Sequence, residues 1–340
     1  MTAMNELITP SIDVVIPVYN APVLTKHCID SVITHLGKSI QKIIIQDDAS
    51  DTKTRNMLDD LHYESTQVYH AKENNGFGKS VNEAIGRSEA SYVLVLNSDT
   101  IVRENFLPSL CLALETDPQL AVIIPSGNHY SAFNLDQYAR QTGNYILTHR
   151  LTGYAFLIRR SVFQEIGGFD SVFGRGYYED IDLGRRLNQS GWRIGVSPNS
   201  YIYHKGGGSF GRNLTYLALK KRSRDSYFSR YPQAKKNILL ISGNCQITDF
   251  PVNVIAAIKN IFEEGGGICW FAPRPTPQLY CIHMTHTSMT LDLLIRLFLF
   301  GLFRKDKLIS EIWILPNASY LKRTMFSFLG RLRGIKVSPV

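Results

Sequence analysis

The sequence predicts an α/β protein: a parallel, Rossmann-like sheet with helices on both faces, followed by a smaller α/β region. Apolar, β-branched runs alternate with helical patterns along residues 12–96, as is typical of buried parallel strands joined by helices. A similar alternation starts again at residue 237, after Tyr231-Pro232. The length of 340 residues also suggests two domains, which we place at 11–235 and 236–340.

Each expected element follows from the period of its apolar residues and from the turn residues beside it. In the first domain, strands are expected at 12–17, 42–46, 67–70, 92–96, 121–125, 154–158, 193–196 and 200–204. Helices are expected there at 23–36, 54–61, 82–87 and 179–189. In the second domain, strands are expected at 237–242, 268–271 and 311–315, and helices at 252–263 and 320–333.

Composition and charge restrict the class of protein. With 44% hydrophobic and 19% charged residues, the chain can bury a core and is not disordered throughout. Residues 236–340 hold 12 Lys and Arg against 6 Asp and Glu, whereas residues 1–235 hold 25 against 23. Because the positive charge is confined to the tail, we expect no nucleic-acid partner.

The cysteines and the apolar segments bear on the compartment. Five cysteines without a CxxC pair indicate neither a disulfide framework nor a zinc site, which favours a reduced, cytosolic location. Residues 1–10 lack the basic start and apolar run of a signal peptide. The longest apolar stretch, 291–303, is shorter than the roughly 20 residues of a membrane span and contains Asp292 and Arg296.

Acidic residues gather near the predicted strand ends, the edge at which open α/β sheets bind ligands. An acidic pair follows the second strand at 47–48, an Asn-Ser-Asp run follows the strand at 92–96, and an acidic run opens a helix at 179–182. Turn and helix-cap preferences alone could place each of these groups. A carboxylate at such an edge could also hold a divalent cation against a nucleotide diphosphate.

One histidine and two glycine-rich segments accompany the acidic groups. The strand at 200–204 ends at His204, beside the glycines 206–208, although a lone histidine is more often a packed or surface residue. We expect residues 206–211 to form a mobile lid that closes over a bound ligand and keeps water out. The glycine loop at 74–78 matches a phosphate cradle only loosely, because it lacks the GKS or GKT ending of a P-loop.

A series of short segments carries a family resemblance. They are IPVYN (16–20), QDDASD (46–51), ENNGFGKSVNEAI (73–85), VLNSDT (95–100), TGYAFLIRR (152–160), GGFD (167–170), YYEDIDLGRRL (177–187) and His204. In this order they resemble family 2 glycosyltransferases of the GT-A fold over roughly residues 11–232. They look similar to the rhamnosyl- and galactofuranosyl-type enzymes of polysaccharide synthesis.

The resemblance implies a donor site and a metal site. The implied donor-binding residues are Pro17, Tyr19, Asp47, Asp48, Asn75, Gly76, Gly78, Asn82 and Asn97. Among them Pro17, Tyr19 and Asp48 would contact the nucleobase and ribose, with Asp47 supporting the turn. Asp99 matches the last residue of the DxD motif that holds Mn²⁺ or Mg²⁺ on the diphosphate, and His204 matches a further metal ligand. Asn97 replaces the first acidic residue of that motif, which implies weaker metal binding.

The resemblance also implies the catalytic and acceptor residues. Asp180 matches the catalytic base, with Glu179 beside it, and the implied acceptor-site residues are Gly153, Tyr178 and Asp182. This assignment suits inverting transfer, in which a carboxylate deprotonates the acceptor hydroxyl as it attacks the anomeric carbon. A cation offsets the charge that gathers on the leaving diphosphate.

The sequence therefore predicts a metal-dependent inverting glycosyltransferase, specifically a hexosyl- or deoxyhexosyltransferase that uses a UDP- or dTDP-sugar. Its acceptor would be a hydroxyl of a saccharide or lipid-linked saccharide in cell-surface polysaccharide synthesis. Two alternatives stay open: a non-catalytic nucleotide-sugar-binding or scaffold protein, and a sugar-phosphate nucleotidyltransferase. The second would carry a Gly-rich basic loop after the first strand, where this chain has PVYNAP.

Two interpretations of the basic tail remain. The segments 291–303 and 320–333 interleave apolar and basic residues, which is the pattern of ordinary amphipathic helices packed on a core. The same pattern suits peripheral attachment to an anionic membrane at the inner face of the cell membrane. A homo-oligomer that buries 291–303 is a further alternative.

Overall fold

The computed structural model describes residues 10–128, 142–206, 214–271, 284–287, 293, 297 and 308–340. The chain folds as two units. The first comprises Met1–Ile146 and Leu151–Arg224, and the second comprises Leu147–Arg150 and Asp225–Val340. The predicted domain boundary at 235–236 follows helix α7 (Leu214–Arg230) and remains a prediction.

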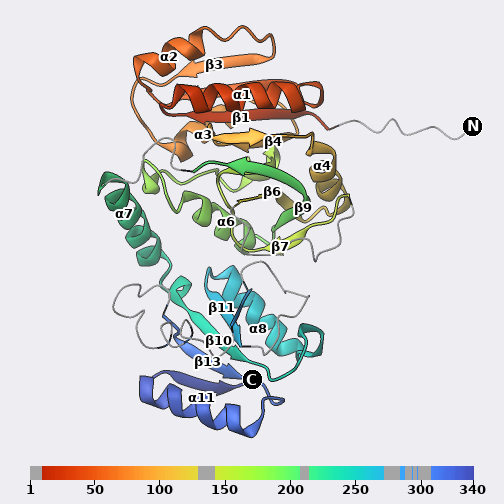
Figure 1. The fold of residues 1–340 in the computed structure, drawn as a ribbon, viewed down its shortest axis with the longest axis vertical. Helices are drawn as coiled ribbons and strands as arrows, with labels where there is room; N and C mark the ends of the chain where they lie inside the picture. The colour runs from red at the N-terminus through yellow and green to blue at the C-terminus, as the bar shows by residue number, and fades with distance from the viewer. Residues whose placement is uncertain are drawn as a thin grey trace, which may run out of the picture. The chain divides into compact units, whose positions relative to one another are not determined.

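The first unit is built on one sheet, in the order β3-β2-β1-β4-β8-β6-β9-β5 (Figure 1). The short strand β7 (Ile146–Thr148) falls at the boundary between the segments assigned to the two units. Four neighbouring strands run parallel: Thr66–His70 (β3), Lys42–Asp47 (β2), Ile12–Val18 (β1) and Tyr92–Leu96 (β4). Every residue of β1 and β4 is buried, as expected of strands with helices on both faces. The predicted parallel α/β arrangement is thus confirmed for this half of the sheet.

The remaining strands make the sheet mixed. They are Thr100–Val102 (β5), Leu120–Gly127 (β6), Ala155–Arg159 (β8) and Arg193–His204 (β9). β8 lies antiparallel between β4 and β6, β9 is parallel to β6, and β5 is antiparallel to β9. The prediction of separate strands at 193–196 and 200–204 was wrong. β9 is continuous because its register on β6 shifts between Pro125 and Ser126, which accommodates the intervening residues of β9.

The helices of the first unit follow the predicted order with additions. They are Pro22–Leu36 (α1), Thr52–Asp59 (α2), Phe77–Gly86 (α3), Leu107–Thr116 (α4), Arg160–Glu165 (α5) and Glu179–Gln189 (α6), with 3₁₀ turns at Gly37–Ser39 and Ser171–Phe173. α6 has the predicted bounds, whereas α3 begins inside the predicted glycine loop. The sequence analysis did not predict α4, α5 and α7.

The second unit contains a parallel sheet in the order β12-β11-β10-β13-β14. Its strands are Asn237–Ile241 (β10), Gly267–Phe271 (β11), Met284–Thr287 (β12), Glu311–Ile314 (β13) and Lys336–Pro339 (β14), with helices Val252–Glu263 (α8) and Tyr320–Arg333 (α11) and 3₁₀ turns Pro232–Lys235 and Ile247–Asp249. The helices α8 and α11 belong to two separate apolar layers (Figure 1). The prediction of a smaller α/β region is confirmed.

In the described part of the chain, no helix combines the length and the apolar character needed to cross a membrane. The expected lid lies outside the described residues except for Gly206, and the apolar stretch 291–303 lies outside them except for Leu293 and Leu297.

Candidate active site

The parallel strands β1, β2 and β4 bring their carboxyl ends to one edge of the first sheet. The loops after β1 and β2 are tied together there. The backbone N–H of Asn20 donates to Ser50 Oγ at 2.8 Å, and the N–H of Asp51 donates to Asn20 Oδ1 at 2.8 Å. The segment containing Pro17 and Tyr19 therefore lies beside the acidic pair, and the donor contacts implied for these residues stay a prediction.

Asp47 supports the turn after β2. Its buried carboxylate accepts the N–H of Ser50 at 3.0 Å and contacts Nδ1 of His70 at 2.7 Å. Nε2 of His70 in turn contacts Asp59 at 2.9 Å. Asp47 is therefore held by protein partners, and the supporting role expected for it in the donor site stays a prediction.

Asp48 holds the glycine loop at the same edge. Its two carboxylate oxygens accept the backbone N–H groups of Asn75 at 2.7 Å and Gly76 at 2.8 Å. Gly76 has a φ of +89°, and a Cβ there would lie 2.4 Å from Cα of Arg175, so only glycine fits without strain. The loop is thus fixed by a carboxylate on one side and by close backbone packing on the other.

Asn82 and Gly78 face the GGFD segment. The Asn82 amide donates to the carbonyl of Phe169 at 2.8 Å and accepts the N–H of Phe169 at 2.9 Å. A Cβ on Gly78 would lie 3.0 Å from Cβ of Phe169. In the structure these two residues position Phe169, and the donor-binding role predicted for them stays a prediction.

The two predicted metal ligands lie together. Nε2 of His204 is 3.0 Å from Oδ1 of Asp99, and both side chains are largely buried. The antiparallel pairing of β5 with β9 produces this contact, because it sets Thr100 opposite His204. Sequence reasoning chose both residues, but it had no means of predicting the strand pairing that joins them.

Asn97 supplies a further oxygen near Asp99 in the chain. Among the residues that the structure describes, its buried Oδ1 has no hydrogen-bond partner, an arrangement that a cation or a ligand donor would satisfy. A carboxylate, an amide oxygen and an imidazole are groups that could together hold a divalent ion. Among the described residues, no group of three or more His, Cys, Asp and Glu side chains forms a metal cluster, so Asn97 matters to this assignment.

Two residues that the sequence analysis did not single out hold His204. The ring of Tyr154 stacks on the imidazole with centroids 5.1 Å apart, and its hydroxyl donates to the carbonyl of Pro125 at 3.0 Å. Asn128 pairs with the backbone of His204 in both directions, at 2.8 and 3.0 Å. Tyr154 lies within the segment TGYAF, so the motif was visible even though the contact was not.

The acidic run at the start of α6 is presented by an unusual turn. Tyr177 and Tyr178 both have a φ of +72°, a left-handed conformation that costs energy for residues other than glycine. The carboxylate of Asp180 then accepts the N–H of Gly153 at 3.0 Å and that of Ile181 at 2.8 Å. The predicted base and the predicted acceptor-site residue Gly153 are therefore in direct contact.

Glu179 and Asp180 have perturbed acidities. Burial and the neighbouring Asp180 raise the pKa of Glu179 from 4.5 to about 8, and Oε2 of Glu179 is buried with no hydrogen-bond partner in the described part of the chain. Burial also raises the pKa of Asp180, while the N–H groups of Gly153 and Ile181 oppose that rise by stabilising the carboxylate. Burial thus favours the protonated form of both carboxyl groups, and the neighbouring charge of Asp180 strengthens this effect at Glu179.

Asp182 has structural partners. Its buried carboxylate accepts Nε of Arg186 at 2.8 Å, and the guanidinium also donates to the carbonyls of Ile166 at 2.8 Å and Gly168 at 2.6 Å. Its backbone N–H donates to the carbonyl of Tyr178 at 2.9 Å. Asp182 thus fixes α6 to the GGFD segment, and the acceptor-site role predicted for it and for Tyr178 stays a prediction.

The fold is shared with solved GT-A glycosyltransferases. A crystal structure of GalNAc-T7 with UDP, GalNAc and Mn²⁺ matches 76% of this chain and 55% of its own, with a TM-score of 0.51 and 14% identity. The mannosyltransferase PcManGT from Pyrobaculum calidifontis, in complex with GDP-Man and Mn²⁺, matches 75% of this chain and 68% of its own, with a TM-score of 0.52 and 16% identity. The predicted GT-A fold is confirmed.

Sequence comparisons give the family. Residues 13–174 match Glycosyl transferase family 2, so the chain contains a family 2 glycosyltransferase domain. Glycosyltransferase GlyG of Streptococcus pneumoniae is 27% identical over 165 residues, which are 48% of this chain and 50% of GlyG. N-acetylglucosaminyl-diphospho-decaprenol L-rhamnosyltransferase of Mycobacterium tuberculosis is 39% identical over 74 residues, 22% of this chain and 24% of that protein. The chain thus spans half or less of the length of these relatives.

Proposed function

We propose that the first unit is a metal-dependent inverting glycosyltransferase. It would move a hexosyl or deoxyhexosyl group from a UDP- or dTDP-sugar to a hydroxyl of a saccharide or lipid-linked saccharide in cell-surface polysaccharide synthesis. The observation that carries the proposal is the carboxyl pair of the buried Glu179 and the half-buried Asp180, on the same unit as the Asp99–His204 pair. The rhamnosyltransferase relative, whose name specifies a decaprenol-linked acceptor, supports this acceptor class.

Asp180 is the proposed general base. Two backbone N–H groups orient its carboxylate, and burial raises its pKa toward the range in which a carboxylate accepts a proton efficiently. Glu179 holds a proton near neutral pH, which spares Asp180 a second negative charge beside it. In this assignment Asp180 takes the proton of the acceptor hydroxyl as that oxygen attacks the anomeric carbon.

Asp99, His204 and Asn97 are the proposed holders of Mn²⁺ or Mg²⁺. The unsatisfied Oδ1 of Asn97 and the Asp99 carboxylate are oxygen ligands suited to such ions. A divalent cation bound there would offset the charge on the leaving diphosphate. The two solved structures with this fold were each determined with Mn²⁺, which supports the choice of metal.

The location that we propose is cytoplasmic and peripheral on the inner membrane face. The helix α11 exposes Leu321, Phe328 and Leu332, each more than 60% accessible, beside its basic residues. Such a surface suits the boundary of an anionic membrane. Replacing Leu321 and Phe328 by serine should weaken co-sedimentation with anionic vesicles, and unchanged binding would remove the support for this location.

A transfer assay tests the proposal. The full chain is incubated with UDP- and dTDP-sugars, Mn²⁺ and a mixed saccharide acceptor pool. We expect acceptor-dependent release of a nucleoside diphosphate and a product whose anomeric configuration, measured by NMR, is opposite to that of the donor. Donor binding without release would favour the non-catalytic alternative, and release of pyrophosphate from a nucleoside triphosphate with sugar phosphate would favour the nucleotidyltransferase.

A further inference from the structure

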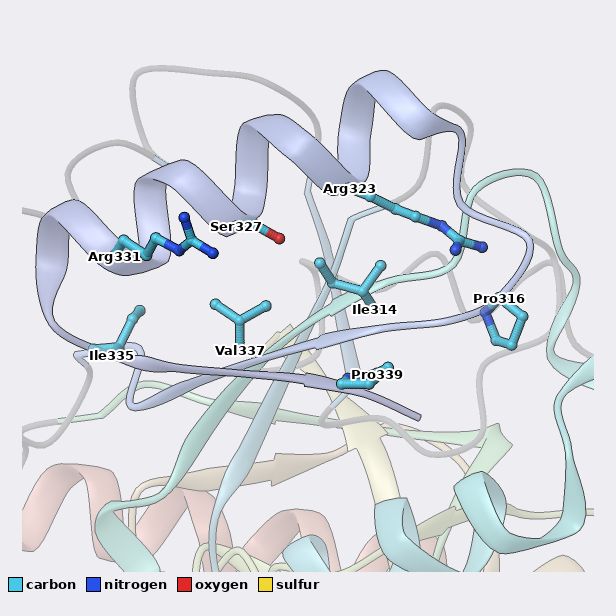
Figure 2. A pocket seen from close by; sticks show the side chains of 8 residues that line it. All are labelled: Ile314, Pro316, Arg323, Ser327, Arg331, Ile335, Val337 and Pro339. Atoms are coloured by element: carbon cyan, nitrogen blue, oxygen red, sulfur yellow. The ribbon is translucent and has the colours of Figure 1, made fainter.

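A pocket of about 520 Å³ lies in the second unit, between α11 and the last two strands of its sheet (Figure 2). Its lining residues are Ile314, Pro316, Arg323, Ser327, Arg331, Ile335, Val337 and Pro339. Ile314 and Pro316 mark the carboxyl end of β13, and the carboxyl ends of parallel strands are where open α/β sheets bind ligands. None of these residues belongs to the candidate active site.

The helical wall of the pocket is cationic. Arg323, Ser327 and Arg331 are spaced four residues apart on α11, so they share one face and span about 12 Å. Figure 2 shows Arg323 and Arg331 at the two ends of the pocket, with Ser327 between them. Nε of Arg323 donates to the carbonyl of Ala318 at 2.8 Å, which leaves its Nη groups available. Within the described residues, no ion pair neutralises either guanidinium.

The strand wall is apolar and has no carboxylate. Because side chains alternate along β14, Val337 and Pro339 line the pocket, whereas Lys336 and Ser338 point to the other face. There they contact Glu311, at 3.5 Å and 2.8 Å. Residues 312–340 contain five Lys and Arg and no Asp or Glu, so no acidic side chain in this stretch opposes the two arginines.

We propose that this pocket binds an organic phosphate, meaning a phosphate or diphosphate ester on an apolar carbon skeleton. Guanidinium groups bind phosphate oxygens through paired, charge-assisted hydrogen bonds, and Ser327 supplies a further donor. The apolar wall formed by Ile314, Ile335 and Val337 accommodates the hydrocarbon part, and the volume lies in the range of small-molecule sites. This site is separate from the proposed transfer reaction and does not depend on it.

Calorimetry on the full chain with geranyl diphosphate, inorganic pyrophosphate and geraniol tests the site. We expect geranyl diphosphate to bind more tightly than either fragment. The double variant Arg323→Gln/Arg331→Gln should weaken that binding by about tenfold for each arginine replaced, because each replacement removes charged hydrogen bonds to the phosphate. The variant Ser327→Phe keeps the charge but fills the pocket, and it should also lose binding.

The matched control is Lys322→Gln/Lys336→Gln, which removes two charges from the same helix and strand without altering the pocket lining. A second arm measures co-sedimentation with phosphatidylglycerol and phosphatidylcholine vesicles. If the arginine and Ser327 variants lose geranyl diphosphate, the ligand is a free organic phosphate. If they lose only phosphatidylglycerol vesicles, it is a lipid headgroup. If the arginine variant matches the lysine control in both arms, the proposal is overturned.

Discussion

Replacing Glu179 by Gln should change how the stability of the protein depends on pH. The pKa of Glu179 rises from 4.5 to about 8 in the fold, chiefly because its side chain is buried, with only 8% exposed. The native state therefore holds a proton more tightly than the unfolded chain does. This contribution to stability is fully present below pH 4.5 and is lost as the pH rises to about 8.

The magnitude follows from the size of that shift. Each pKa unit corresponds to about 1.4 kcal/mol, so the wild type should lose at most about 5 kcal/mol between pH 4.5 and 8 through Glu179. The Gln variant keeps the shape of a protonated glutamate and cannot ionise. The free energy of unfolding of the wild type should therefore fall relative to that of the variant between pH 4.5 and about 8, and the difference should stay constant above that pH.

Urea unfolding at pH values between 5 and 9 measures this difference directly. Glu104→Gln is the control, because Glu104 is an exposed glutamate of the same unit. The curve of unfolding free energy against pH should flatten for the Glu179 variant and keep its wild-type form for the control. If the Glu179 variant and the wild type give parallel curves, Glu179 does not hold a proton in the fold, and the division of roles with Asp180 is wrong.

The remaining predictions concern the glycine loop and the metal site. Gly76→Ala should lower the free energy of unfolding by about 2–5 kcal/mol, because the new Cβ would overlap a neighbouring backbone at a residue with positive φ. Gly86→Ala, at the other end of the helix that Gly76 caps, is the control. It has open space for the Cβ, so its effect should be neutral or stabilising. Chemical denaturation compares the two. Asp99→Ala should weaken the Mn²⁺-dependent binding of UDP or dTDP, and His204→Ala should weaken it less. Calorimetry with and without a chelator tests both variants. If the wild type binds the nucleotide equally well with and without chelator, neither residue has a metal role.

The parallel half of the fold could be predicted because its hydrophobic pattern is local in the sequence. The strands β1, β2 and β4 are buried on both faces, so their sequences are continuous apolar runs. α6 was also predictable with its bounds, because three acidic residues occupy its first turn, where the helix dipole favours them. The strands β1, β2 and β4 and the loops directly after them carry most of the predicted donor-binding residues.

The elements that were missed depend on contacts distant in sequence. Pro198 and Asn199 interrupt the strand pattern of β9, and only pairing with β6 through a shifted register makes that strand continuous. α7 begins with a mainly apolar stretch and continues with a basic one, so its sequence shows no clear apolar face and its periodicity is weak. α4 carries Pro108 in its first turn, a start signal that was visible in the sequence but not used.

In the candidate site, too, some features could be predicted from the local sequence and others depend on distant contacts. The residue types of Asp99, His204 and Asp180 identified them in the sequence, but their partners come from the fold. The contact of Asp99 with His204 requires the β5–β9 pairing, and the contact of Asp180 with Gly153 joins residues that are distant in the chain. The partners of Asp182 could not be predicted, because an acidic residue in a first helical turn looks the same whether it faces an acceptor or an internal arginine.

The assignment of Asp180 as the base is tested most directly by Asp180→Asn. This change keeps the size of the side chain and removes its ability to accept a proton. We expect sugar transfer, measured as nucleoside diphosphate release with acceptor present, to fall by about 10²–10⁴-fold, while donor binding measured by thermal shift stays close to that of the wild type. The exposed Asp60→Asn variant is the control and should transfer normally. Near-normal turnover by the Asp180 variant would contradict the account.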